Sequence, residues 1–106
     1  MDSLLIEEVK ELTSFIRSSG KWGDVRTLIR AGGFDPDAVL LASFLEGENA
    51  EEWGVLVTEQ MQVFEWFRNT DNQSTPTHWK EITNEPQLTD RYPQVLVAFA
   101  LLSKRP

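Results

Sequence analysis

Acidic side chains gather in one short segment, residues 46–52, and carboxylates are groups that bind cations or transfer protons. The segment carries four glutamates in seven residues: Glu46, Glu48, Glu51 and Glu52. It lacks the alternating ligands and the bidentate glutamate spacing of a dedicated Ca²⁺ loop. Carboxylate pairs that cleave glycosidic bonds need a cleft, whereas the tip of a hairpin is convex. We therefore expect a solvated loop. An acidic contact surface for a basic partner protein is the functional alternative, and a metal site is the least favoured one.

The chain has one histidine, His78, which could act as a general base if a carboxylate oriented it. Asp71 and Glu81 are the candidates for that carboxylate. Three hydroxyl groups could be nucleophiles, and they belong to Ser74, Thr75 and Thr77. No spacing among these residues matches a nucleophile motif. We therefore expect His78 to be a partly exposed structural residue, and we expect no enzymatic activity, no cofactor and no metal.

The four tryptophans are the most informative side chains, because a domain this small cannot bury all of them deeply. Two of them, Trp53 and Trp66, fall with Phe64 on neighbouring segments that we expect to pair as strands. Helices then either cover both apolar faces of the sheet or leave one face for a partner, and we favour the second. The candidate protein-binding residues are aromatic residues of the sheet and acids of the loop: Trp53, Phe64, Trp66, Glu48, Glu51 and Glu52.

Two helices are predicted in the first third of the chain. Over residues 3–19, apolar side chains recur every three or four positions, as they do in an amphipathic helix. A shorter helix is expected at about 24–31, with Asp24 as its N-cap and the glycine pair 32–33 at its end.

Strands are predicted next, at 38–45, 53–58, 62–68 and, as a short fourth strand, 79–83. The second and third alternate in polarity, and the short link between them predicts an antiparallel hairpin. Residues 95–102 are apolar almost all round. We expect a C-terminal helix there, capped by Thr89 or Asp90 and packed on the middle of the sheet, with a buried strand as the alternative. This order predicts an α+β fold: N-terminal helices, a central antiparallel meander of three or four strands and a C-terminal apolar helix packed on the sheet.

Length, charge and cysteine content narrow the class of protein. The 106 residues predict one compact domain, 1–106, and the absence of cysteine excludes disulfides and thiolate metal sites. A net charge of −7 argues against nucleic acid as a partner. The longest apolar run has eight residues, too few to span a bilayer, and the acidic N-terminus does not resemble a signal peptide. We therefore expect a cytoplasmic protein without a membrane partner.

These observations favour a non-catalytic protein-binding module, such as an adaptor, an inhibitor or an immunity-type protein. A structural subunit or homodimer assembled through the sheet is the alternative, and a small enzyme that depends on His78 is less favoured. The acid excess suggests a basic protein partner.

Overall fold

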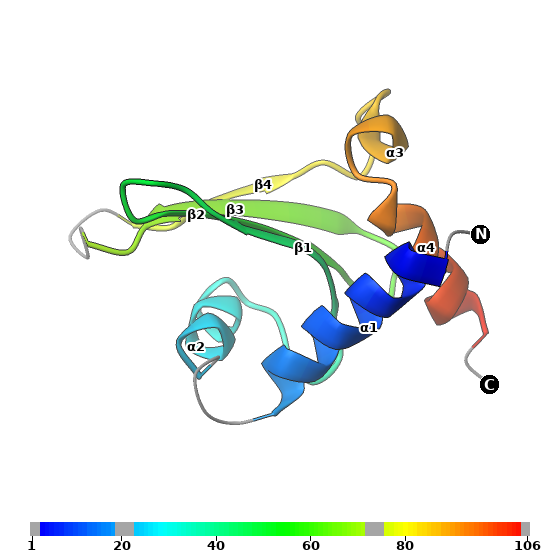
Figure 1. The fold of residues 1–106 in the computed structure, drawn as a ribbon, viewed down its shortest axis with the longest axis horizontal. Coiled ribbons are helices and arrows are strands. Elements are labelled where there is room, and N and C mark those ends of the chain that lie inside the picture. The colour runs from blue at the N-terminus through cyan, green and yellow to red at the C-terminus, as the bar shows by residue number, and fades with distance from the viewer. Residues whose placement is uncertain (1–2, 19–22, 72–75, 105–106) are drawn as a thin grey trace.

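The computed structural model describes residues 3–18, 23–71 and 76–104 (Figure 1). The elements follow one another as α1 (Ser3–Arg17), α2 (Gly23–Ala31), β1 (Leu40–Glu46), β2 (Glu51–Val57), β3 (Val63–Asn69), β4 (His78–Glu81), α3 (Leu88–Arg91) and α4 (Gln94–Ser103). The predicted α+β class is confirmed, and so is each predicted element, with ends displaced by a few residues. The predicted N-cap Asp24 is wrong, because α2 already begins at Gly23, and the predicted end of the first helix, residue 19, lies outside the described residues.

The four strands form one sheet in the order β1-β2-β3-β4, and each neighbouring pair is antiparallel. The predicted meander is therefore confirmed, with four strands. In the hairpin between β2 and β3, Trp53 lies opposite Phe67 and Val57 lies opposite Val63. A bulge interrupts the pairing of β1 with β2 between Leu41 and Ser43.

The turn between β1 and β2 and the turn between β2 and β3 each place a residue other than glycine in the left-handed region of φ. Ala50 has a φ of 61° and Met61 a φ of 64°. In the second turn, the Met61 amide donates to the Thr58 carbonyl at 2.9 Å, and the Thr58 amide donates to the Gln62 carbonyl at 2.9 Å. These two bonds close a three-residue loop, the connection used when a hairpin has no Asn-Gly or Asp-Gly pair.

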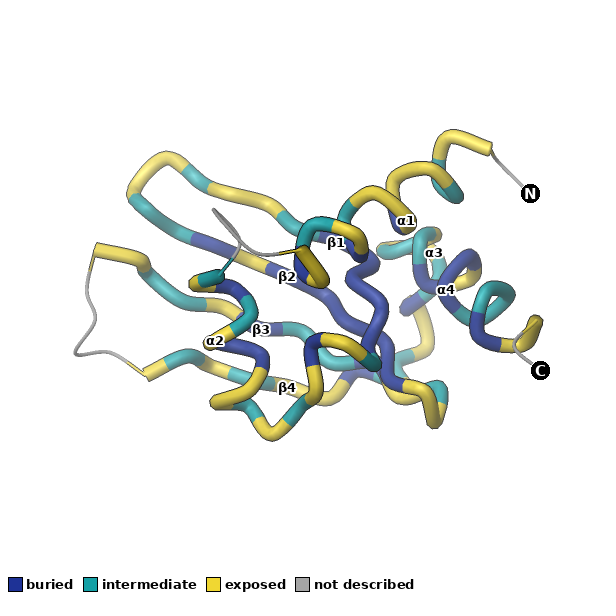
Figure 2. The backbone as a smooth tube through the Cα atoms, turned by 90° about the horizontal axis from the view of Figure 1, so that it is seen from below, coloured by how far each residue is buried: buried dark blue, intermediate teal, exposed yellow. Residues whose placement is uncertain are grey.

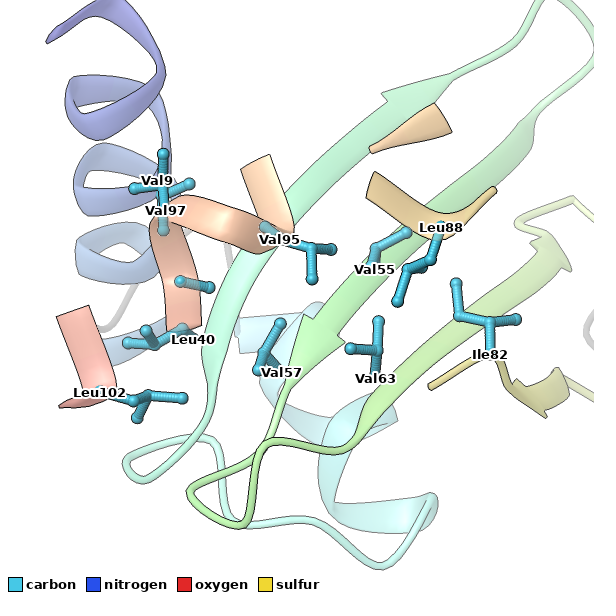
Figure 3. Packing of buried hydrophobic residues seen from close by; sticks show 12 residues of the cluster. Val9, Leu40, Val55, Val57, Val63, Ile82, Leu88, Val95, Val97 and Leu102 are labelled. Carbon is cyan, nitrogen blue, oxygen red and sulfur yellow. The ribbon is translucent and has the colours of Figure 1, made fainter. Parts of the chain in front are cut away.

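Side-chain alternation gives the sheet two different faces. The α2 face carries Leu41, Leu56 and Trp66, which pack against α2 and the end of α1. The opposite face, which we call the α4 face, carries Val55, Val57 and Val63. Figure 3 shows these valines in one cluster with residues from three helices: Val9 of α1, Leu88 of α3, and Val95, Val97 and Leu102 of α4. Buried positions therefore concentrate in the half of the sheet next to α4. The turn between β1 and β2, at the opposite end of the sheet, is mostly exposed (Figure 2).

The C-terminal segment is helical, so the buried-strand alternative for residues 95–102 is wrong. Its helix is divided at Pro93, where α3 ends and α4 begins, and Gln87 precedes α3 without a side-chain cap. The predicted cap at Thr89 or Asp90 is therefore also wrong. α4 packs at one end of the sheet, against α1, β1 and β2, rather than on its middle (Figure 1). No helix in the described ranges is both long and apolar enough to cross a membrane.

Candidate functional site

Four side chains form a row across the α4 face, beyond the part of that face that helices cover. The register places Leu45 opposite Trp53, Trp53 opposite Phe67, and Phe67 opposite His78. We call these four residues the cross-strand row. Leu45 is 60% exposed, Trp53 39% and Phe67 38%, and the two aromatic rings are 5.3 Å apart. In Figure 1, α2 lies below this half of the sheet, and none of the helices in the described residues lies above it.

The row forms one wall of a groove of about 500 Å³, and the segment joining α3 to α4 forms the other. The Tyr92 hydroxyl donates to Glu65 Oε2 across the groove at 3.3 Å. Burial raises the pKa of Tyr92, and the negative charge of Glu65 raises it further, so the hydroxyl stays a proton donor at neutral pH. The Arg91 guanidinium lies 5.1 Å from the centre of the Tyr92 ring. The groove therefore combines an apolar wall with a rim that already holds a cation against an aromatic ring.

The hairpin between β1 and β2 adds negative charge at the end of the sheet next to the row. Glu46 and Glu48 are exposed and Glu51 is partly exposed, and none of the three forms an ion pair within the described ranges. A Cβ atom at Gly47 would lie 2.8 Å from the Trp53 ring and 3.1 Å from Cβ of Glu51. The Trp53 ring therefore lies over Gly47, beside Glu51.

Glu52 does not belong to that solvated loop, so its assignment to an exposed acidic surface is wrong. It lies in β2 on the α2 face and is only 4% exposed. Its Oε2 accepts hydrogen bonds from Trp66 Nε1 at 3.0 Å and from Arg68 Nε at 2.7 Å. A buried carboxylate needs such partners, and the strand alternation turns Glu52 to the side where they lie.

Trp66 and Phe64 also face α2, so the expectation that they form an exposed surface is wrong. Trp66 is 1% exposed, and its ring lies against Gly54 of the neighbouring strand, where an added Cβ would clash with it. Phe64 is partly buried, and its ring centre lies 4.8 Å from that of Phe34. Of the predicted aromatic residues, only Trp53 lies on the open half of the sheet.

The side chains that could make His78 catalytic are not brought together in the described part of the chain. His78 is exposed on the α4 face, whereas Glu81 lies on the α2 face, where it accepts a hydrogen bond from Thr83. No hydrogen bond joins His78 to Asp71 there. Ser74 and Thr75 lie outside the described residues. Within the described ranges, no group of three or more histidine, aspartate or glutamate side chains could hold a metal ion.

A second hollow, of about 570 Å³, lies between α1, β1 and α4. Two of the polar groups that line it already have intramolecular roles. Thr13 Oγ1 accepts the Leu41 amide at 3.0 Å, and Arg17 donates to the Val39 carbonyl at 3.1 Å. Both bonds hold β1 against α1, so we assign this hollow a structural role.

No family model matches this sequence, and comparisons with curated proteins and with solved structures gave no significant match either. The assignment of a site therefore rests on the geometry alone, and the geometry singles out the cross-strand row.

Sequence reasoning missed Leu45, Phe67, Glu65 and Tyr92 as members of the site. A signal for one of them, Phe67, was present in the predicted hairpin. With the turn centred at Gln60, Trp53 must pair with Phe67 rather than with Trp66, because paired positions lie equally far from the turn. The contribution of Tyr92 had no such signal, because it depends on the place where the chain breaks between α3 and α4.

Proposed function

We propose that this protein is a non-catalytic binding module that docks another protein on the cross-strand row. One observation carries the proposal: three apolar side chains from three neighbouring strands stay exposed next to one another on one face. Covering them with α2 or α4 would bury apolar surface, yet both helices pack elsewhere. The largest exposed apolar patch of a small protein is often its interaction site, and tryptophan is enriched among the residues that dominate interface energies.

The exposed apolar patch is smaller than the surface that a stable interface buries on each partner. An aromatic side chain can bury about 150–250 Å², so the exposed parts of Leu45, Trp53 and Phe67 together amount to roughly 300 Å². A stable interface buries about 800 Å² on each partner. The row therefore suits the anchoring point of a partner that also contacts the groove and the acidic hairpin. A cytoplasmic location is part of this proposal, and cell fractionation tests it.

Two matched variants test the proposal. Leu45 in the row and Leu96 on α4 are exposed to similar extents, 60% and 51%. Leu45→Lys places a charge in the row, whereas Leu96→Lys makes the same chemical change at a distant position. Tagged wild-type protein and both variants are used to capture proteins from the native host, and retained proteins are identified by mass spectrometry.

A protein that wild type and Leu96→Lys retain in equal amounts, and that Leu45→Lys loses, supports the proposal. Sedimentation of the purified chain is measured in parallel. A wild-type dimer that Leu45→Lys converts to a monomer would replace the proposal with self-assembly through the sheet. Equal retention by all three proteins would show that the row is not the binding surface.

A further inference from the structure

We propose that the cross-strand row recognises a cationic protein segment, in which arginine or lysine side chains flank a central apolar one. The inference rests on the proposed function and adds the chemistry of the partner. The inference follows from the charges beside the row, from the aromatic rings in the row and from the spacing of two carboxylates along the strands.

Carboxylates flank the row on both sides of the same face. Glu51 lies two residues before Trp53 on β2, and Glu65 lies two residues before Phe67 on β3. Because alternate residues of a strand point to the same face, both carboxylates share the α4 face with the row. The antiparallel pairing then places Glu51 on the hairpin side of the row and Glu65 on the α3 side. A segment bound over the row therefore meets a negative charge at each margin.

The two margins differ in how far their negative charge is compensated within the described residues. Glu51 forms no ion pair there, whereas Glu65 pairs with Arg91 at 3.8 Å, accepts a hydrogen bond from Tyr92 and lies opposite Lys80. Arg91 and Lys80 both approach Glu85 more closely, at 3.0 Å each. The exposed carboxylates of Glu46 and Glu48 add to the field at the hairpin end. Charge complementarity therefore favours a cationic occupant and opposes an acidic one.

The aromatic rings of the row favour the same occupant. A cation within about 6 Å of an aromatic ring centre is attracted by the negative face of the ring, and arginine makes this contact most often. The groove already contains one such pair, because the Arg91 guanidinium lies 5.1 Å from the centre of the Tyr92 ring. The partly exposed rings of Trp53 and Phe67 offer similar surfaces to a cation from outside.

The spacing of the two carboxylates indicates the sequence pattern of the occupant. Glu65 lies opposite Val55, four residues along β2 from Glu51. At about 3.3 Å per residue in a strand, the two carboxylates start about 13 Å apart along the strand direction. An extended segment that runs along the strands covers the same span between positions i and i+4, and the side chain at i+2 points the same way. The matching pattern has a cationic residue at position i, an apolar residue over the row at i+2 and a second cationic residue at i+4.

Three pentapeptides test this pattern on the full chain. The first is acetyl-Arg-Ser-Leu-Ser-Arg-amide, and glutamine or glutamate replaces both arginines in the other two. Binding is followed by the ¹⁵N–¹H signal of the Trp53 indole, which is assigned by its loss in Trp53→Phe. We expect the arginine peptide to bind at least tenfold more tightly than the glutamate peptide, and several-fold more tightly than the glutamine peptide.

A charge-matched pair of double variants identifies the carboxylates. Glu51→Gln with Glu65→Gln should weaken the arginine peptide at least fivefold and leave the glutamine peptide unchanged. Glu7→Gln with Glu11→Gln removes the same charge from the exposed surface of α1 and should change neither. The inference is wrong if the glutamine peptide binds as tightly as the arginine peptide, if both double variants weaken binding equally, or if no peptide shifts the Trp53 signal at millimolar concentration. Loss of the captured partner in Leu45→Lys can still support the proposed function in each of these cases, so the two failures are distinguishable.

Discussion

Glu52 has a structural role that its neighbours in the acidic segment do not share. It accepts hydrogen bonds from Trp66 and, through both carboxylate oxygens, from Arg68. Arg68 also donates to Asp24 of α2 at 2.8 Å. Burial alone would lower the pKa of the Arg68 guanidinium, but the bonds and charges of Glu52 and Asp24 raise it above its ordinary value. The network fixes the Trp66 ring and joins α2 to the sheet.

Removing the charge of Glu52 should therefore destabilise the fold. Glu52→Gln keeps the size of the side chain but leaves the partly buried Arg68 with only Asp24 as a counter-charge. We expect the free energy of unfolding to fall by about 2 kcal/mol, because a buried charge loses its paired partner. Urea denaturation measures the change. Glu48→Gln, in the exposed loop, is the control and should lie within about 0.5 kcal/mol of wild type; equal losses in the two variants would contradict a structural role for Glu52.

The difference between Glu48 and Glu52 shows what a sequence can predict at the scale of a residue. Composition groups all four glutamates together, and the loop assignment is right for Glu48. The environment of Glu52 depends on residues 14 and 16 positions away, which only the strand register brings into contact. Likewise, Trp66 is buried because Gly54 of the adjacent strand leaves room for its ring. The burial of Trp66 could not be predicted from either residue alone.

At the scale of elements, α4 shows how an apolar segment still acquires an outer surface. Val95, Val97, Ala98 and Leu102 are buried, whereas Leu96 is 51% exposed. The sequence of this helix has no polar face, so hydrophobicity alone assigns Leu96 to the core. Its exposure follows from the position of α4 at one end of the sheet, where α4 contacts α1, α3, β1 and β2.

Two aspartate substitutions separate the two sides of α4. Leu96→Asp should remain folded and cost less than about 1 kcal/mol, because the charge stays in water near the positive end of the helix dipole. Val97→Asp buries an unpaired carboxylate and should cost more than about 3 kcal/mol. Circular dichroism during thermal unfolding compares them. If Leu96→Asp unfolds as readily as Val97→Asp, the described orientation of α4 is wrong.

An ion pair at the start of β1 gives the fold a pH dependence. Arg26 of α2 donates to Asp37 at 2.9 Å and also to the carbonyl of Ile16 at the end of α1. The hydrogen bond from Arg26, together with its charge, lowers the pKa of Asp37 below its ordinary value of 3.8, although partial desolvation acts in the opposite direction. A carboxyl group with a lowered pKa stabilises the folded state above its unfolded-state pKa and loses that contribution as pH falls through its folded-state pKa.

Asp37→Asn should therefore be less stable than wild type at pH 7, and the difference should shrink below about pH 4. Urea midpoints of the two proteins, measured in steps from pH 7 to pH 2.5, give this difference directly. Asp35→Asn is a nearby control, since no ion pair involves Asp35 within the described ranges. A difference between wild type and Asp37→Asn that stays constant over the whole range would exclude the titration of Asp37 as its cause.

Most elements could be predicted from sequence, because periodicity identifies them locally. Apolar spacing indicated α1 and α2, and alternation indicated β2 and β3 and their faces. The break between α3 and α4, the bulge in β1 and the packing of α4 at one end of the sheet could not be predicted in this way. The bulge and the packing of α4 depend on contacts between distant segments, such as the bond from the Leu41 amide to Thr13 at the bulge. The break falls at Pro93, whose backbone has no amide hydrogen to donate.

At the scale of the whole molecule, the helices cover one face of the sheet and only part of the other. α2 and α1 bury the aromatic and aliphatic residues of the α2 face, while α3 and α4 bury the valines at one end of the α4 face. The remaining half of that face carries the cross-strand row, bordered by the acidic hairpin. The sequence correctly indicated two apolar faces. It could not show that helices would cover the whole of the α2 face but only one end of the α4 face.

The dissociation constant of the captured partner tests the role of the row most directly. Calorimetric titration with purified partner compares wild type, Leu45→Lys and Leu96→Lys, after circular dichroism has shown that all three are folded. We predict that Leu45→Lys weakens binding at least 30-fold, which corresponds to the roughly 2 kcal/mol typical of a dominant interface residue. Leu96→Lys should stay within about threefold of wild type. Equal affinities for Leu45→Lys and wild type would contradict the assignment of the cross-strand row as the binding surface.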